Sequence, residues 1–117
     1  MNETQNIIKL LSICRYSLHN EKAFQQDIAD ALKKYNIPFL REHILDKSSK
    51  PDFTLNDGII IEAKIKGNAK KIYKQCVRYC EFESVKTLIL ITNRTIGFPK
   101  EIKGKSCYVI NTGKAWL

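Results

Sequence analysis

The amino-acid sequence predicts a single α/β domain of the α+β kind, in which helices flank a mixed central β-sheet in the order α-α-β-β-β-α-β-β. Apolar residues recur at helical spacing in residues 3–18, 21–35 and 69–82, whereas apolar runs of strand length fill much of the remaining chain. A turn sequence at residues 56–58 joins two of these runs into a hairpin. Helices that alternate with paired strands in this way are typical of layered folds with one shared core.

The first two helices are predicted from their apolar stripes and from one cap. Residues 3–18 carry the first stripe, and Asn20 is a suitable N-cap for a second helix from Glu21 to about Tyr35. The expected buried residues are Ile7, Leu10, Leu11, Cys14 and Leu18 in the first helix, and Phe24, Ile28, Ala31, Leu32 and Tyr35 in the second.

The register of the hairpin follows from the alternation of side chains along its strands. A two-residue turn would place Asp52 and Glu62 on opposite faces of the hairpin. A three-residue loop at 56–58 sets the two carboxylates opposite each other and keeps the apolar face continuous. We therefore predict the three-residue loop, in which Gly58 is the left-handed residue.

The remaining elements are predicted from the same two periodicities. They are a strand at 39–45, a basic loop at 46–50, a helix at 69–82, a strand at 85–92 and a last strand at 107–111. The helix carries one stripe that we expect to be buried and a neighbouring stripe that is polar and basic. The first stripe comprises Ile72, Tyr73, Cys76, Val77 and Cys80, and the second comprises Lys71, Gln75, Arg78 and Tyr79.

Length and charge restrict the class of protein. The 117 residues suffice for one core, and we divide the domain into an N-terminal helix (1–19), a catalytic core (20–93) and a C-terminal loop and strand (94–117). The net charge of +8 favours polyanionic partners, among which nucleic acid is the commonest. The polar residues 1–5 and the lack of a long apolar run predict neither a signal peptide nor a membrane span, so we expect a cytoplasmic, intracellular protein.

Pro51-Asp52 and, ten residues later, Glu62-Ala63-Lys64 carry the chemistry of the chain. Opposed carboxylates repel unless a cation lies between them. Mg²⁺ (or Mn²⁺) suits this position because it takes a few carboxylate oxygens, keeps several waters and binds phosphate. Lys64 on the same face can orient the attacking water and offset charge on the phosphorane. We therefore predict metal-dependent phosphodiester hydrolysis, the alternative being an exposed hairpin with a surface Glu–Lys pair.

This pair of motifs resembles the PD-(D/E)XK nuclease superfamily, whose fold is called restriction-endonuclease-like, over roughly residues 20–93. The resemblance implies that Asp52, Glu62 and the main-chain carbonyl of Ala63 bind the metal. It also implies that Lys64 is the catalytic lysine.

The resemblance implies three further residues. A glutamate on the helix before the hairpin often joins the metal site in this superfamily, which makes Glu21 a candidate ligand; the helix dipole explains a glutamate in a first turn equally well. Gln75-x-x-x-Tyr79 resembles the QxxxY motif of the RecB and lambda-exonuclease branch, in which both residues lie beside the active site and contact DNA. An ordinary amphipathic helix would show the same pair.

Other residues are given binding or structural roles. The basic residues expected to hold DNA phosphates are Lys47, Lys50, Lys66, Lys70, Lys71, Lys74, Arg78 and Arg94, flanked by Lys100. The four cysteines, Cys14, Cys76, Cys80 and Cys107, are expected in the core rather than in a zinc or iron–sulfur site. Trp116 is expected to close an edge of the core, with base stacking as the alternative.

The predicted activity is that of a Mg²⁺-dependent deoxyribonuclease in DNA repair or recombination. The small size favours an exonuclease or a structure-specific enzyme that acts on ends, flaps or junctions. One alternative is a Holliday-junction resolvase that acts as a homodimer. Another is a non-catalytic DNA-binding or assembly subunit that keeps the nuclease fold. ATP-driven work would require a larger nuclease–helicase assembly, because the sequence has no Gly-rich phosphate loop.

Overall fold

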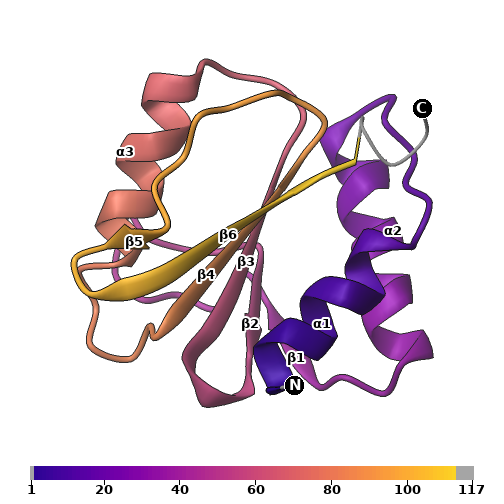
Figure 1. Cartoon of the computed structure of the whole chain (residues 1–117), viewed down its shortest axis with the longest axis horizontal. Helices are drawn as coiled ribbons and strands as arrows, with labels where there is room; N and C mark the ends of the chain where they lie inside the picture. Colours follow the sequence, from indigo (N-terminus) through magenta and orange to yellow (C-terminus); the bar gives the residue numbers. More distant parts are fainter. Residues whose placement is uncertain (1, 113–117) are drawn as a thin grey trace.

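A computed structural model describes residues 2–112 of the chain, within which three α-helices and six β-strands form (Figure 1). The elements are α1 (Glu3–Ser12), α2 (Glu21–Lys34), β1 (Phe39–Arg41), β2 (Phe53–Leu55), β3 (Ile59–Lys64), α3 (Ala69–Tyr79), β4 (Thr87–Thr92), β5 (Glu101–Ile102) and β6 (Lys105–Asn111). In this part of the chain, no helix combines the length and the apolar character that a membrane crossing requires.

The six strands form one mixed sheet in the order β1-β2-β3-β4-β6-β5. The pairs β1–β2, β2–β3 and β5–β6 are antiparallel, and the pairs β3–β4 and β4–β6 are parallel. The predicted α+β class with a mixed sheet is thus confirmed. The two-residue strand β5 was not predicted, because positive φ angles at Lys103 and Gly104 make a tight turn within what the sequence indicates as a loop.

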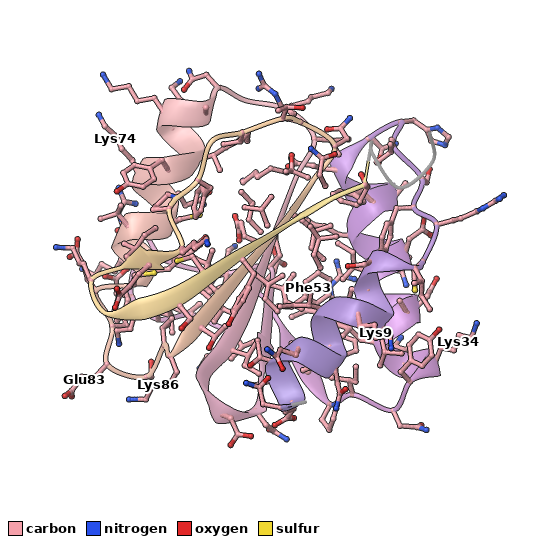
Figure 2. The ribbon with its side chains drawn as sticks, viewed as in Figure 1. Lys9, Lys34, Phe53, Lys74, Glu83 and Lys86 are labelled. Carbon is pink, nitrogen blue, oxygen red and sulfur yellow. The ribbon has the colours of Figure 1, made fainter. Side chains whose placement is uncertain are left out.

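Helices cover both faces of the sheet, with α1 and α2 on one face and α3 on the other (Figure 1). Two apolar cores result. The first core includes Phe24, Phe53 and Ile61 and lies between the sheet and the α1–α2 pair, while the second includes Ile60 and Cys76 and lies under α3. Phe53 is completely buried in the first core (Figure 2).

Both N-terminal helices begin at asparagine caps, and α1 is shorter than predicted. The Asn20 side chain accepts a hydrogen bond from the Ala23 backbone N–H over 2.8 Å, which confirms the predicted cap of α2. The prediction that the first helix extends to Leu18 is wrong, since α1 ends at Ser12 and Leu18 is 37% exposed. Side chains of Ser12, Cys14 and Tyr16 donate to backbone carbonyls of the last turns of α1.

Further boundaries differ from the predicted ones, among them the start of the last strand, β6, which is Lys105 rather than residue 107. Strand β1 ends at Arg41 rather than residue 45, because Glu42 has a φ of 53° and turns the chain into the loop of residues 42–51. Helix α3 ends at Tyr79 rather than residue 82, and β4 begins at Thr87 rather than residue 85. The connection between them is therefore longer than predicted.

The hairpin has the predicted register. Phe53 pairs with Ile61 and Thr54 pairs with Ile60, so residue 52 lies opposite residue 62. The connection is the three-residue turn Asn56–Gly58, in which Gly58 has a φ of 72° as predicted and Asp57 also has a positive φ, of 61°. The hydrophobic alternation therefore predicted correctly that the two carboxylates lie opposite each other.

Gly58 is also the point at which the turn approaches a neighbouring segment. A Cβ there would lie 2.7 Å from the Ser84 carbonyl oxygen, whereas a Cβ on Gly104, which also has a positive φ, would have no neighbour within 4 Å. We expect Gly58→Ala to lower the free energy of unfolding by about 2–5 kcal/mol, from left-handed strain plus a steric clash. Gly104→Ala should cost only the strain, about 1–2 kcal/mol. Urea denaturation of both variants checks this, and equal losses would contradict the packing around the turn.

The stripes of α3 differ from the prediction at both tyrosines. Tyr73 was expected in the core but is 42% exposed and packs edge-to-face on Phe98, whose ring centroid is 5.9 Å away. Tyr79 was expected on the polar stripe but is 1% exposed. The reason is geometric, because residues 72, 76 and 79 follow the i, i+4, i+7 spacing that faces the sheet.

Candidate active site

The two predicted carboxylates lie side by side at the β2–β3 hairpin, on the face of the sheet covered by α3. Asp52 directly precedes β2, and Glu62 lies within β3, two residues after Ile60 of the second core. Because side chains on a strand alternate, Lys64 shares the face of Ile60 and Glu62. The structure thus brings the three predicted residues together.

Two crossed hydrogen bonds hold the carboxylates in place. The backbone N–H of Asp52 donates to Glu62 Oε1 over 3.1 Å, and the backbone N–H of Ala63 donates to Asp52 Oδ2 over 2.8 Å. Each carboxylate is therefore fixed by the opposite strand and keeps a second oxygen for other ligands. The N–H and the C=O of one strand residue point to the same side of the strand, so the Ala63 carbonyl lies on the side of β3 where its N–H meets Asp52.

Lys64 forms an ion pair with the inner carboxylate. Its Nζ lies 3.3 Å from Glu62 Oε2, and the side chains are 23% and 1% exposed. The amine therefore lies between a buried acid and solvent. From this position it can reach both the carboxylates and a substrate that approaches from outside.

The site holds more carboxyl groups than amines, and this shows in their pKa values. Burial raises the pKa of Glu62 to about 8; repulsion by Asp52 adds to the rise, and Lys64 opposes it. Burial likewise raises the pKa of Asp52 to about 6, against the hydrogen bond from Ala63 and the charge of Lys64. Burial alone would lower the pKa of Lys64, but the surrounding carboxylates raise it above its usual value. Lys64 therefore does not fully offset the cost of ionising both buried carboxyl groups.

Glu21 brings a further carboxyl group within electrostatic range of the site. It is the first residue of α2, and its charge raises the pKa values of both Asp52 and Lys64. Glu21 Oε1 is buried and has no hydrogen-bond partner among residues 2–112. A buried carboxylate oxygen needs a partner, so this atom is suited to a cation or a bound water.

The predicted QxxxY pair borders the site from α3. The Tyr79 hydroxyl donates to the Lys50 carbonyl over 3.3 Å, and burial together with the adjacent Glu62 raises the pKa of this tyrosine. Gln75 is half-buried and lines the same pocket as Tyr79. Tyr79 is therefore part of the wall between that pocket and the carboxylates.

The predicted basic residues occupy two regions. Lys66, Lys70, Lys71 and Lys74 are exposed on the loop before α3 and on its outer surface, where Lys74 projects into solvent (Figure 2). Lys47 and Lys50 line the pocket beside Gln75, and Lys50 also pairs with Glu42 at 3.8 Å. Arg78 donates to the Ser48 carbonyl over 3.3 Å, so it also anchors a loop. Arg94 follows β4 near the end of β3, and Lys100 precedes β5; both are exposed.

The oxygen donors suit a hard divalent cation. Asp52, Glu62 and the Ala63 carbonyl provide oxygen ligands only, and Mg²⁺ needs just one or two carboxylates because it keeps several waters. Within residues 2–112, no three His, Cys, Asp or Glu side chains converge into a ready-made metal cage. The unpartnered Glu21 Oε1 and the cost of ionising two adjacent buried carboxyl groups nevertheless fit Mg²⁺ or Mn²⁺ at this place.

Three of the cysteines are core residues, as expected. Cys76, Cys80 and Cys107 are buried free thiols in the second core, and Cys14 is a half-buried free thiol at the end of α1. Trp116 lies outside the described residues.

The loop of residues 44–50 is the part of the site that the sequence did not predict beyond its positive charge. Ile44, Asp46 and Ser48 line the pocket together with the two lysines. Only the approach of this loop to α3 makes the pocket, and no local pattern encodes that approach. An apolar residue next to a basic loop, Ile44, is the one signal in the sequence that could have indicated it.

Comparisons of the chain with models of protein families, with curated proteins and with solved structures found no match.

Proposed function

We propose that this chain is a Mg²⁺- or Mn²⁺-dependent deoxyribonuclease of the PD-(D/E)XK kind, with a restriction-endonuclease-like core. The observation that carries the proposal is the buried, hydrogen-bonded pair Asp52–Glu62 with Lys64 next to it, in which one amine faces more than one carboxylate. A domain that needed only to bind DNA would gain nothing from burying two carboxylates against each other.

Asp52, Glu62 and the Ala63 carbonyl would hold the metal ion, with Glu21 as a further ligand directly or through water. When bound, the ion would supply an activated water and charge stabilisation at the phosphate. The two crossed hydrogen bonds keep the carboxylates at fixed positions, so little reorganisation is needed when substrate arrives.

Lys64 would act on the reacting phosphate group. Its amine is partly exposed and its raised pKa keeps it protonated at neutral pH. A protonated amine can donate hydrogen bonds to the attacking water and to the phosphorane oxygens. The resemblance implies products with 5′-phosphate and 3′-hydroxyl ends.

The basic residues around the site would bind the DNA backbone. Lys66, Lys70, Lys71 and Lys74 extend from the end of β3 along α3, and Lys47 and Lys50 lie on the facing loop. Contacts of this kind hold phosphates and give no sequence specificity. Because such contacts do not read sequence, we favour an exonuclease or a structure-specific enzyme over a sequence-specific one.

The proposal is tested by incubating the protein with single-stranded DNA, blunt duplex, flaps and four-way junctions in Mg²⁺, Mn²⁺ or EDTA. We expect at least one of these DNAs to be cut with either metal and none to be cut in EDTA. If every DNA stays intact while binding is measurable, the enzyme is excluded and a non-catalytic DNA-binding subunit takes its place.

A further inference from the structure

A pocket of about 310 Å³ lies between the loop of residues 44–50 and α3. It adjoins the candidate active site in two ways. Tyr79, whose hydroxyl lies next to Glu62, forms part of its wall, and Lys50, two residues before Asp52, forms another part. A group bound in this pocket would therefore lie beside the reacting phosphate.

The pocket wall is already held in place without any ligand. Arg78 donates to the Ser48 carbonyl and Tyr79 donates to the Lys50 carbonyl, each over 3.3 Å, so α3 holds the loop at two points. Within the loop, the Leu45 N–H donates to the Ser49 carbonyl over 2.8 Å, and Ser49 is completely buried. A preformed pocket loses little conformational entropy when it binds a ligand.

The lining combines the three kinds of group that one nucleotide needs. Ile44 is 66% exposed and offers an apolar surface to the face of a base. The Gln75 amide can both donate and accept hydrogen bonds at a base edge. Lys47 and Lys50 offer cations to the adjoining phosphates.

The size of the pocket favours an unpaired base over a base pair as the bound group. A volume of 310 Å³ is at the lower end of the range for small-molecule sites, which suits one nucleotide and not a base pair with its two backbones. A base stacked inside a duplex cannot enter such a pocket unless it leaves its pair.

We infer that this pocket holds one unpaired nucleotide beside the cleavage site, so that the DNA substrate is single-stranded or carries an unpaired end. The inference deepens the proposed nuclease function and rests on it, because the bound DNA is a substrate only if the protein is a nuclease. The binding part stands separately and can be measured without any metal.

The test is the affinity, measured in EDTA by fluorescence anisotropy, for a short labelled single strand, for a blunt hairpin duplex with the same number of phosphates, and for an abasic strand of the same length. We expect the single strand to bind about tenfold more tightly than either of the other two, as base stacking and apolar contacts contribute. Equal affinity for the normal and abasic strands would overturn the inference, because phosphate contacts alone would then explain binding.

The matched variants are Ile44→Asp in the pocket and Ile13→Asp at the end of α1, since these isoleucines are 66% and 65% exposed. Ile44→Asp should weaken binding of the normal strand about tenfold or more and should change binding of the abasic strand less. Ile13→Asp should leave both affinities unchanged. Equal effects of the two substitutions would contradict the pocket.

The same variants separate this inference from the proposed function. If the protein binds single strands through Ile44 but cuts no DNA with Mg²⁺ or Mn²⁺, the nuclease proposal fails and the pocket stands. If the protein cuts blunt duplex and single strands equally well and Ile44→Asp has no effect, the nuclease stands and the pocket fails.

Discussion

Lys64→Ala is expected to lower the rate of DNA cleavage by about 10²–10³-fold, because it removes the group that donates to the attacking water and to the charged phosphorane. The Nζ of Lys64 is 3.3 Å from Glu62 Oε2. Within residues 2–112, Lys64 is the one residue that forms an ion pair with Glu62. The fold should persist, since the lysine side chain is 23% exposed and Glu62 can take up a proton when its partner is lost. Single-turnover cleavage with Mg²⁺ and circular dichroism of the same samples measure both effects.

Lys9→Ala is the control for the loss of one positive charge. Lys9 projects from α1, on the face of the sheet opposite α3 (Figure 2). This substitution should change cleavage little. If Lys64→Ala and Lys9→Ala cut DNA at the same rate, the amine has no part in the reaction and the site is wrongly assigned.

The stability of the metal-free protein is expected to fall as the pH rises from about 4.5 to about 8. An unfolded chain loses the Glu62 proton near pH 4.5, whereas the folded protein, in which burial raises the pKa, holds it to about pH 8. The folded state therefore binds more protons across this window, and the free energy of unfolding decreases with pH. Asp52 acts in the same direction between its ordinary value and about pH 6. The combined loss is on the order of a few kcal/mol, measured by urea denaturation in EDTA at pH 5 and pH 8.

Glu62→Gln should remove most of this pH dependence, because glutamine keeps the shape of the side chain and cannot ionise. The variant should be more stable than the unmodified chain at pH 8 and similar to it at pH 5. Glu83→Gln, on the exposed connection after α3, is the matched control and should retain the full pH dependence (Figure 2). If the free energy of unfolding depended on pH to the same extent in all three proteins, Glu62 would not be the group whose raised pKa causes the dependence.

The local parts of the structure were predictable from the sequence, and the approaches between distant segments were not. The hairpin register follows from period-two alternation and the three-residue loop, since a pairing shifted by one residue would turn apolar residues to the other face. The exchange of Tyr73 and Tyr79 between surface and core depends on which side of α3 meets the sheet, and that side is set by tertiary packing. For the same reason, the sequence could suggest Glu21 as a ligand through resemblance but could not place its carboxylate near Lys64.

The pocket shows this limit most clearly. Its wall needs Arg78 to reach the Ser48 carbonyl across 30 positions of sequence, and Tyr79 to reach the Lys50 carbonyl across 29. Neither contact leaves a local pattern. The sequence did indicate a basic loop on one side of the pocket and a polar helix stripe on the other. It did not indicate that the two lie close together.

The central claim is that Asp52 and Glu62 form a divalent-cation site that hydrolyses DNA. It is tested most directly by measuring cleavage of one labelled DNA by the unmodified chain and by Glu62→Gln as Mn²⁺ is increased from zero. We predict that the rate for the unmodified chain rises with Mn²⁺ and reaches a plateau, while Glu62→Gln stays at the background rate throughout. Cleavage that does not depend on Mn²⁺, or equal rates for the two proteins, would contradict the claim.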